Sequence, residues 1–423
     1  MNARELALKT LYDVFYKDAY SNLALKKTLS SNNALSAADK SLMTNLVYGV
    51  VSRHFTLEYV IGRYSKLKLK KISDYIKLIL EMGIYQLMYT DRIPAHAAVN
   101  ESVLLAKKYG RPGTDRFVNG VLRAFCRDGC AVTYPQTGTD RLAVRYSFST
   151  EMTRLFQDNF GDERAERIMD ALNDAPPLIL RANILKNSAE ELIKMLEDAG
   201  IKSELIGCAL IRAEGFDVGG SDIYRSGRFS VQDQGAYNAA LVLDPEPGCS
   251  VLDMCAAPGG KSAHAAELMG DRGSISAYDI HPHKIELIEE TARRLGLHSI
   301  TAGLSDAAVY NDALAGRFDR VLCDVPCSGL GIIRRKPDIK LGRNDISGLY
   351  DLQRRILDNG AEYAKPGGKL VYSTCTINKA ENEGIIGGFL ERHGNFEKTY
   401  EKTFYPDTDG TDGFYVCRLE KIQ

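Results

Sequence analysis

The chain has 423 residues, which is too many for one hydrophobic core, so two or three domains are expected. With 44% hydrophobic and 26% charged residues and a net charge of −1, its composition is that of an ordinary soluble globular protein. The first residues lack the apolar stretch of a secretory signal, and no apolar run is long enough to span a bilayer. We therefore expect a cytoplasmic protein with no membrane partner.

The nine cysteines are scattered along the chain, and an odd number cannot all be paired. Free thiols in a reducing compartment are therefore expected rather than a disulfide framework. The pairs Cys126/Cys130 and Cys323/Cys327 have a spacing that zinc ligands can have, but no second pair of suitable spacing follows either of them. We expect no metal site.

The N-terminal part, residues 1–126, is predicted to be entirely helical. Ser36 precedes Asp39 as a helix N-cap, and Gly110–Gly113 forms a turn before a last helix at Asp115–Cys126. No cluster of histidine, cysteine or paired acids is present, so we expect no chemistry here. Apolar residues recur at helical spacing in four earlier stretches, Leu6–Phe15, Leu42–Ile61, Ile72–Tyr89 and Ala97–Lys108.

Part of this helical region is strongly basic. Residues 61–125 contain twelve Lys and Arg against five Asp and Glu, a net charge of about +7. The densest group is Lys66, Lys68, Lys70 and Lys71. A basic domain beside a more acidic remainder suits phosphate binding, although a solvated helix face is the commoner explanation for a single cluster.

The middle of the chain has a mixed pattern. Residues 127–145 are polar and irregular and are predicted to be a linker, and residues 146–235 are predicted to form a small α+β subdomain. Its expected helices are Ser149–Asn159, Asp162–Asn173 and Ser188–Ala199, and its expected strands are Leu178–Asn183 and Ala209–Ala213.

From residue 236 to 423 strands and helices alternate, which predicts an α/β domain with a largely parallel, covered sheet. In such a sheet, ligands bind beyond the carboxyl ends of the strands. A last segment, Gly413–Leu419, alternates and is expected to be an edge strand. The other expected strands are Ser250–Met254, Ser274–Tyr278, Ile300–Gly303, Arg320–Cys323 and Lys369–Ser373. The expected helices are Lys261–Met269, Lys284–Leu295, Leu349–Ala364 and Glu381–His393.

The most specific pattern is Val251–Ser262, in which an apolar strand ends near Asp253, a loop of small residues follows and a helix begins near Lys261. Small residues let the backbone approach a ligand closely, and the helix start offers free N–H donors. The run lacks the three-glycine spacing of dinucleotide-binding loops, and Cys255 stands where a phosphate-binding loop needs a glycine. These two common nucleotide-binding loops are therefore not indicated.

Acidic residues follow the next three predicted strands. Asp279 is placed to accept hydrogen bonds from both ribose hydroxyls of an adenosine ligand, Asp306 to reach an adenine amino group, and Asp324 closes the fourth strand. Each acid alone is more often a helix N-cap or a turn residue. Together with the glycine-containing loop on the first strand they indicate a nucleoside cofactor.

Two cysteines follow the fourth and fifth predicted strands, Cys327 and Cys375. An isolated cysteine is usually a small hydrophobic core residue, but both of these lie in loops at the ligand edge of the sheet. A thiolate that adds to carbon 6 of cytosine makes carbon 5 nucleophilic enough to take a methyl group from a sulfonium, whose positive charge also favours the thiolate. The carbon 5 proton must then leave and the thiol be eliminated, which needs one activated thiolate and one nearby acid/base group.

Three motifs around these residues, Asp253–Lys261, Asp324–Gly329 and Ser373–Thr376, together resemble the RNA cytosine-5 methyltransferase family. The resemblance implies a Rossmann-like methyltransferase domain that binds S-adenosylmethionine. It also implies that Cys375 is the nucleophile, that Cys327 helps proton removal and product release, and that Asp324 contacts the cytosine ring. The cofactor-binding residues that it implies are Cys255, Ala256, Ala257, Pro258, Gly259, Gly260, Lys261, Asp279, Asp306 and Asp324.

The N-terminal helical region is similar to NusB-like RNA-binding domains. Joined to the catalytic domain, it resembles those members of the family that modify the RNA of the small ribosomal subunit. That resemblance covers nearly the whole chain and implies one cytosine of 16S rRNA as the target, in free rRNA or in a subunit precursor. We expect the protein to be monomeric.

A base cannot react while it is stacked in a helix, so the cytosine must come from a loop or be flipped out. A group of basic residues follows the Cys327 loop, and we expect these residues to bind RNA phosphates beside the site. The alternative is that they lie on a solvated loop with no ligand. The group consists of Arg334, Arg335, Lys336, Lys340 and Arg343.

Three other functions fit the sequence less well. A DNA cytosine-5 methyltransferase would attack with Cys327, and the second cysteine, Cys375, argues against it. A non-catalytic RNA-binding assembly factor would not need the cysteine pair and the cofactor residues. A nicotinamide dehydrogenase would need the glycine fingerprint that the chain lacks.

Overall fold

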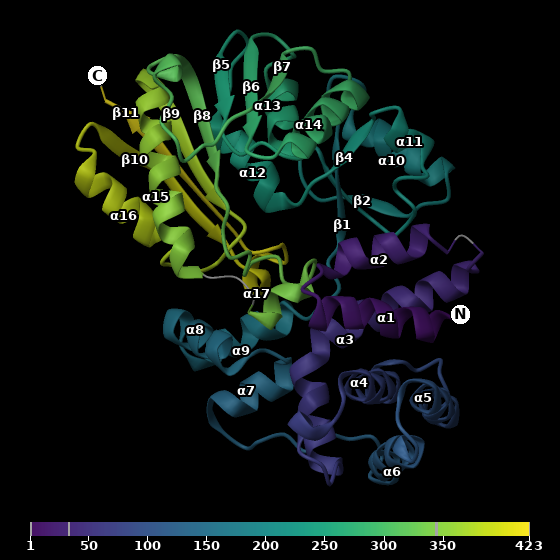
Figure 1. Cartoon of the computed structure of the whole chain (residues 1–423). Helices are drawn as coiled ribbons and strands as arrows, with labels where there is room; N and C mark the ends of the chain where they lie inside the picture. The colour runs from purple at the N-terminus through teal and green to yellow at the C-terminus, as the bar shows by residue number, and fades with distance from the viewer. Residues whose placement is uncertain (1, 33, 343–345, 423) are drawn as a thin grey trace. The chain divides into compact units, whose positions relative to one another are not determined.

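The computed structural model describes residues 2–32, 34–342 and 346–422 (Figure 1). The chain divides into two compact units, one of Met1–Asn173 with Ile333–Arg343 and the other of Asp174–Ile332 with Asn344–Gln423. The chain therefore leaves the second unit shortly after Cys327, contributes a short segment to the first, and returns. No helix in the described ranges is both long and apolar enough to cross a lipid bilayer.

The first unit is helical, as predicted for residues 1–126. The side chain of Ser36 accepts a hydrogen bond from the amide of Asp39 and so caps α3, as expected. Leu11, Val47 and Leu80 are fully buried in the shared core of the first six helices. The helices are α1 (Ala3–Tyr16), α2 (Ser21–Ser30), α3 (Ala37–Tyr64), η1 (Leu69–Lys71), α4 (Asp74–Tyr89), α5 (Ala95–Tyr109), α6 (Thr114–Arg127), α7 (Gly138–Tyr146), α8 (Thr150–Phe160), α9 (Asp162–Ala171) and η3 (Pro337–Leu341).

The prediction of an irregular linker over residues 127–145 is wrong for its second half, which forms α7. This nine-residue helix is too short to be stable alone and depends on tertiary contacts. Arg141 pairs with Glu166 of α9, with its Nη2 2.5 Å from Oε2, and Leu142 is buried. The expected helices that follow it are confirmed as α8 and α9, and both lie in the first compact unit.

The prediction that Lys340 binds a phosphate is wrong, because its side chain is fully buried inside the first unit. Its ammonium donates hydrogen bonds to the carbonyl oxygens of Ser52 (3.0 Å) and Tyr146 (3.1 Å) and to the side-chain oxygen of Asn173 (2.6 Å). Burial lowers its pKa well below the ordinary lysine value. Lys340 therefore anchors the segment 333–342, and the prediction for Arg343 lies outside the described residues.

A buried charged cluster joins α3 to α4. The Nδ1 atom of His54 lies 3.1 Å from Glu81 and its Nε2 atom 3.7 Å from Glu58, which also pairs with Lys77 at 2.9 Å. Within the described ranges, the histidine and its two acids are the one group close enough together to hold a metal ion. However, the two ring nitrogens face different carboxylates, which is the arrangement of a doubly protonated histidine in an ion-pair network.

The stability of this cluster is expected to depend on pH. Burial acts to lower the pKa of His54, but the carboxylates of Glu81 and Glu58 outweigh it and raise the pKa above 6.5. The ion pair therefore contributes stability that is complete below about pH 6.5, the unfolded value, and is lost as the pH rises through the folded pKa. Amide hydrogen exchange should show that the opening free energy of α3 and α4 decreases over this range.

The control for that measurement is His96, an exposed histidine on α5. His54→Gln should remove the pH dependence and His96→Gln should retain it. An unchanged pH dependence in His54→Gln would contradict the assignment.

The smaller sheet of the second unit is antiparallel, with the strand order β2-β3-β1-β4. The predicted β1, β3 and α10 are confirmed to within one residue, whereas β2 and β4 were not predicted because they are only three residues long. Leu180, Leu192, Ile211 and Phe229 form its core. The elements are β1 (Leu178–Ala182), α10 (Ala189–Asp198), β2 (Ser203–Leu205), β3 (Leu210–Ala213), α11 (Asp222–Arg225) and β4 (Phe229–Val231).

The larger sheet has seven strands in the order β10-β11-β9-β8-β5-β6-β7. All pairs from β9 to β7 are parallel, and β11 is antiparallel to both of its neighbours. The α/β prediction is confirmed, with every expected strand and helix present. The strands are β5 (Ser250–Asp253), β6 (Ser274–Asp279), β7 (Ile300–Leu304), β8 (Phe318–Asp324), β9 (Ala364–Thr374), β10 (Phe396–Phe404) and β11 (Phe414–Lys421).

Helices cover both faces of this sheet (Figure 1). Alternate residues of each strand point to opposite faces, so that Val371 packs in one apolar cluster while its neighbours Leu370 and Tyr372 pack in the other. The first cluster includes α12, α13 and α14, and the second α15 and α16. These helices are α12 (Gln234–Leu243), α13 (Gly260–Leu268), α14 (Pro282–Leu295), α15 (Ile346–Tyr363) and α16 (Glu383–Arg392); a short α17 spans Pro406–Asp409.

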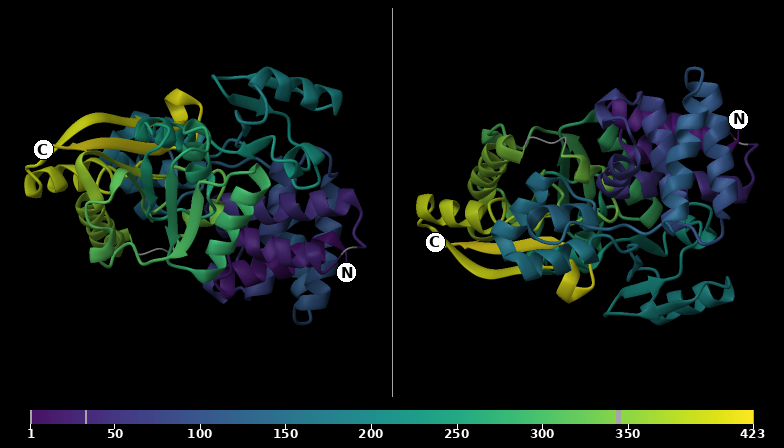
Figure 2. Two further views of the ribbon diagram at one scale, coloured as in Figure 1. Left: turned by 90° about the horizontal axis from the view of Figure 1, so that it is seen from above. Right: turned by 90° about the horizontal axis from the view of Figure 1, so that it is seen from below.

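The prediction that Gly413–Leu419 is an edge strand is wrong, because β11 lies between β9 and β10. The strand at this edge of the sheet is β10, which runs beside β11 in both views of Figure 2. It was not predicted because most of its side chains are polar and exposed, and only its end residues Phe396 and Phe404 are buried. Charged side chains are usual on an edge strand, where they discourage pairing with another sheet.

Candidate active site

The predicted site residues lie at the carboxyl ends of the parallel strands. The chain proceeds from β5 outwards to β7 and then returns to place β8 on the other side of β5, which makes the β5–β8 boundary the point where ligands bind in open α/β sheets. Asp253, Asp279 and Asp324 end β5, β6 and β8, and Cys375 directly follows β9. The fold therefore brings the predicted cofactor loop and the cysteines to one edge.

The loop between β5 and α13 is held in place by backbone hydrogen bonds. The amide of Ala256 donates to the carbonyl of Tyr278 on β6 (2.8 Å), and the amide of Gly259 donates back to Ala256 (2.7 Å). Gly259 has a φ of +97°, a conformation that strongly favours glycine. A Cβ added to Gly260 would meet nothing within 4 Å, so the backbone is open to a ligand at the start of α13.

Not every residue of the predicted loop offers its side chain to that space. Ala256 is 6% exposed and packs with Ala277 and Ile288 in an apolar cluster, so only its backbone could face a ligand. Cys255 is partly buried, and burial raises the pKa of its thiol well above the ordinary value. It is therefore an unreactive small residue in the loop.

Two predicted acids lie at the same edge of the sheet, at the end of β6 and just after β7, which are on the side of β5 away from β8. Asp279 is 5% exposed and accepts a hydrogen bond from the amide of His281 at 3.1 Å. Asp306 is exposed and accepts from Ala308 at 2.9 Å. The amide of Ser305 donates to the Asp279 carbonyl (3.1 Å), so the backbone segments that carry the two acids lie side by side. A small pocket is lined by Leu252, Met254, Tyr278, Ser305, Asp306, Ala307, Leu314 and Tyr363.

Asp324 connects the cofactor loop to β9. Its carboxylate accepts hydrogen bonds from the ammonium of Lys261 at 2.6 Å and from the hydroxyl of Ser373 at 2.7 Å. Burial acts to lower the pKa of Lys261, but the carboxylates of Asp324 and Asp253 outweigh it and raise that pKa. Lys261 is therefore a permanent cation, and the thiol of Cys375 is among the groups whose charge it senses.

The two cysteines meet directly. The Sγ atoms of Cys327 and Cys375 lie 3.3 Å apart, and both side chains are partly exposed. The hydrogen bond to Cys375, burial and the negative charge of Glu381 raise the pKa of Cys327 well above the ordinary thiol value. Cys327 is thus held as a thiol while Cys375 is beside it.

The sequence did not single out Glu381, yet its fully buried carboxylate joins the two cysteine loops. It accepts hydrogen bonds from the amide (2.8 Å) and hydroxyl of Ser328, which follows Cys327. The hydroxyl of Thr376, which follows Cys375, is 3.4 Å away. Two further donors are the side-chain amides of Gln353 (2.9 Å) and Asn378 (3.0 Å). The only available signal was an acidic residue at the expected start of a helix, which usually marks a cap.

Asp253 was likewise not among the predicted site residues. It is 1% exposed, and burial raises its pKa to about 7. The hydroxyl of Ser262, on the first turn of α13, donates to it at 2.6 Å. Asp253 therefore links the first turn of α13 to the end of β5 through a buried hydrogen bond.

Comparison with family models divides the chain into three matched parts. Residues 240–420 match the 16S rRNA methyltransferase RsmB/F model, residues 1–127 match the NusB family, and residues 152–213 match the ferredoxin-like domain of RsmF/B-like methyltransferases. The three matches agree with the predicted fold class, a NusB-like helical domain followed by a small α+β subdomain and a Rossmann-like methyltransferase domain. The chain is accordingly an S-adenosylmethionine-dependent methyltransferase.

Similar proteins and structures extend over the whole chain. The probable ribosomal RNA small subunit methyltransferase B of Bacillus subtilis (strain 168) is 37% identical, with 99% of each chain covered. The ribosomal RNA small subunit methyltransferase B of Erwinia tasmaniensis is 34% identical, with 93% of this chain and 94% of that protein covered. The crystal structure of PH0851 shares the fold, with a TM-score of 0.82, 23% identity and coverage of 98% and 97%.

A shorter solved structure, a methyltransferase homologue from Pyrococcus horikoshii, covers 68% of this chain and 100% of its own, with a TM-score of 0.60 and 29% identity. This likeness is limited to part of the chain, whereas the curated relatives match it from end to end. By the full-length similarity and the matching models, the chain belongs to the RsmB/F family of 16S rRNA methyltransferases.

Proposed function

We propose that the protein transfers a methyl group from S-adenosylmethionine to carbon 5 of one cytosine in 16S rRNA, through a covalent bond between Cys375 and carbon 6. The observation that carries this proposal is the 3.3 Å separation of the Cys327 and Cys375 sulfurs beside the Lys261–Asp324 ion pair. Two thiols, a fixed cation and a carboxylate in one place supply a nucleophile, a proton acceptor and a means of charge stabilisation.

Cys375 acts as the nucleophile in this proposal. The ammonium of Lys261 favours its thiolate, and Asp324 keeps that ammonium in position through the 2.6 Å contact. The thiolate forms a bond to carbon 6 of the cytosine, and the electrons of the 5,6 double bond move to carbon 5. Carbon 5 then takes the methyl group, which S-adenosylmethionine supplies when bound.

Cys327 completes the reaction by removing the carbon 5 proton. Before the Cys375 sulfur bonds to carbon 6, the hydrogen bond with Cys375 is the main reason that the Cys327 pKa is raised. Bonding of the Cys375 sulfur to carbon 6 takes away this partner, so the Cys327 thiol can release its proton to solvent and, as a thiolate, accept the carbon 5 proton. The 5,6 double bond re-forms as the bond between carbon 6 and sulfur breaks, and Cys375 leaves as a thiolate.

The loop and the acids described above would hold the cofactor. The open backbone at Gly260 suits a ligand that lies close to the chain. In this proposal Asp279 would accept hydrogen bonds from the ribose hydroxyls, and Asp306, which lines the small pocket, would reach the adenine amino group. Lys261 and Asp324 lie between this region and the cysteines, which would put the methyl group beside the cytosine.

The direct test is methyl transfer to 16S rRNA with radioactively labelled S-adenosylmethionine, followed by digestion to nucleosides. We expect the label in 5-methylcytidine at one position, and mapping of the 5-methylcytosines that disappear on gene deletion should identify the same nucleotide. Label in another nucleoside, or in DNA but not in rRNA, would contradict the proposal.

We further expect Arg334 and Arg335 to contact RNA phosphates. Their replacement by Ala should weaken rRNA binding and reduce the slope of log K against log salt by about 0.7 for each phosphate of single-stranded RNA that the protein no longer binds. Lys26→Ala with Lys27→Ala, two exposed lysines of α2, is the matched control with the same change of charge. Equal slopes for the two double variants would contradict a local role.

A further inference from the structure

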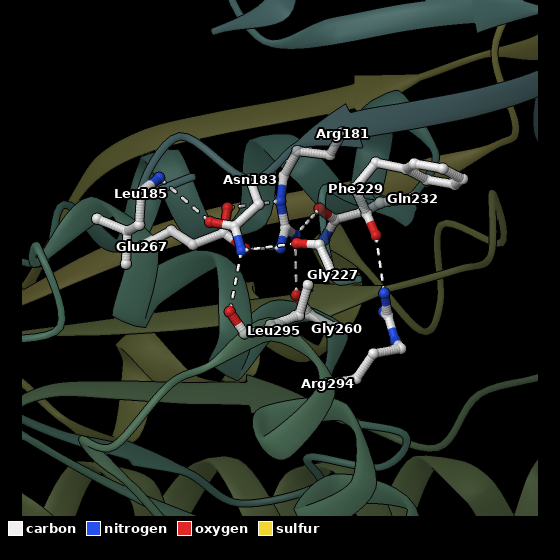
Figure 3. A network of polar contacts seen from close by, with 10 residues as sticks. All are labelled: Arg181, Asn183, Leu185, Gly227, Phe229, Gln232, Gly260, Glu267, Arg294 and Leu295. Atoms are coloured by element: carbon white, nitrogen blue, oxygen red, sulfur yellow. Dashed lines mark hydrogen bonds and ion pairs between the residues drawn. The ribbon is translucent and has the colours of Figure 1, made fainter. Parts of the chain in front are cut away.

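A network of buried polar groups connects the small α+β subdomain to the helix that follows the cofactor loop (Figure 3). At its centre is Arg181 of β1, which is 1% exposed. Its guanidinium forms two hydrogen bonds with Glu267 of α13, at 2.7 Å and 3.2 Å, and Glu267 is itself 2% exposed. A buried bidentate ion pair of this kind has a well-defined geometry.

The same guanidinium reaches the cofactor loop. Its Nη1 atom donates to the carbonyl oxygen of Gly260 at 3.0 Å, and also to the side chain of Gln232. Gly260 is the first residue of α13 and lies between Gly259 and Lys261 of the loop. One side chain of the small subdomain is thus bonded directly to the backbone of the proposed cofactor site.

The two contacts on α13 restrain both its rotation and its position along its axis. Gly260 and Glu267 are seven residues apart, so they lie on one face of the helix, and about 10 Å of rise separates them. The Glu267 side chain leans back toward the start of the helix, where Arg181 can hold both groups. The free N–H groups at the start of α13 are fixed in place as a result, whereas the Lys261 side chain is held separately by its 2.6 Å contact with Asp324.

We propose that Arg181 is a positioning residue for the cofactor, through which the small subdomain sets the affinity for S-adenosylmethionine. This inference rests on the proposed role of the Asp253–Lys261 loop. Arg181 acts through the Gly260 carbonyl and does not touch the cofactor. Its effect is therefore on the binding of S-adenosylmethionine and not on the methyl transfer that follows.

The test separates this role from stability. Removing one member of a buried ion pair is strongly destabilising, whereas replacing both by apolar residues is often neutral, so the variant is Arg181→Met with Glu267→Met. We expect its dissociation constant for S-adenosylmethionine, measured by calorimetry on the full chain, to rise about tenfold, equal to about 1.4 kcal/mol. KM for S-adenosylmethionine should rise equally, while kcat at saturation stays within about threefold.

Arg294→Met is the matched control. Arg294 of α14 also joins the small α+β subdomain to the methyltransferase domain, because it donates to the carbonyl oxygens of Tyr224 (3.0 Å) and Phe229 (2.9 Å). It does not contact the Asp253–Lys261 loop. Its removal should leave the affinity for S-adenosylmethionine unchanged. A second variant, Arg181→Lys, keeps the charge opposite Glu267 but has one ammonium in place of the planar guanidinium, which bonds Glu267 and Gly260 through separate nitrogens, so it should also weaken the binding.

Wild-type affinity in both Arg181 variants would overturn the proposal and leave the network a purely structural contact. An equal loss of affinity for S-adenosylmethionine in Arg294→Met would also overturn the proposal. Any contact between the small subdomain and the methyltransferase domain would then have the same effect, and Arg181 would have no special role. If the wild-type protein itself did not bind S-adenosylmethionine, the proposed function would fail instead, and the two failures are therefore distinguishable.

Discussion

Cys375→Ala should abolish both methyl transfer and the covalent RNA–protein adduct. Removal of a covalent nucleophile is expected to lower turnover by at least about 10⁴-fold, because the remaining groups can only bind the substrates. The measurement is a denaturing gel of enzyme mixed with rRNA and S-adenosylmethionine, on which an adduct migrates as a heavier band. Turnover is followed in parallel with labelled cofactor.

Cys327→Ala should give the opposite result on the same gel. Carbon 6 still receives the Cys375 thiolate, but the carbon 5 proton has no acceptor, so the adduct accumulates and turnover falls by about 10²–10⁴-fold. Cys208→Ala, an exposed cysteine of the small subdomain, is the control and should behave as the wild type. An adduct in Cys375→Ala that is absent in Cys327→Ala would assign the nucleophile to Cys327, as in DNA cytosine-5 enzymes.

Glu381→Gln should lower methyl transfer by about 10²-fold without affecting S-adenosylmethionine binding. The carboxylate accepts all of its hydrogen bonds, whereas a glutamine would turn an NH₂ group toward donors such as the amide of Ser328 and the side chain of Gln353. The two cysteine loops would then separate, and a misplacement of about 1 Å can cost about 10²-fold in rate.

A distance-sensitive measurement distinguishes this positioning role from general destabilisation. With a mild thiol oxidant, the sulfurs at 3.3 Å should form a disulfide rapidly in the wild type, seen as the loss of two hydrogen atoms by mass, and more slowly in Glu381→Gln. Glu383→Gln is the matched control, since Glu383 is partly buried two residues later but bonds to neither cysteine loop. Wild-type turnover and disulfide formation in Glu381→Gln would refute the role.

Most of the fold could be predicted because each element is encoded locally. The helices of residues 1–126 and the alternating α/β pattern after residue 236 follow from apolar periodicity and capping residues such as Ser36. The prediction was wrong where tertiary contacts stabilise a weak segment. The helix α7 depends on tertiary contacts, which include the burial of Leu142 and the pair of Arg141 with Glu166, and β10 is an edge strand whose polar residues resemble a loop.

The site could be predicted in part for the same reason. The loop Val251–Ser262 and the two cysteines are short motifs whose chemistry can be recognised from residue type and spacing, and all lie at one edge of the sheet. Lys340 shows the limit of this reasoning, because a basic residue near an active-site motif looks the same in a sequence whether it is exposed or fully buried. Burial is a property of the packed chain.

The sequence by itself predicted the order of the domains, the loop proposed to bind the cofactor and the two cysteines proposed to react. Only the tertiary structure decided that Glu381 lies under both cysteine loops and that Arg181 is bonded to Gly260, which is 79 residues away. Neither residue belongs to a local pattern, because each acts through partners that are distant in the chain. Such a partnership exists only after folding, when burial removes water and makes each buried charge depend on the groups around it.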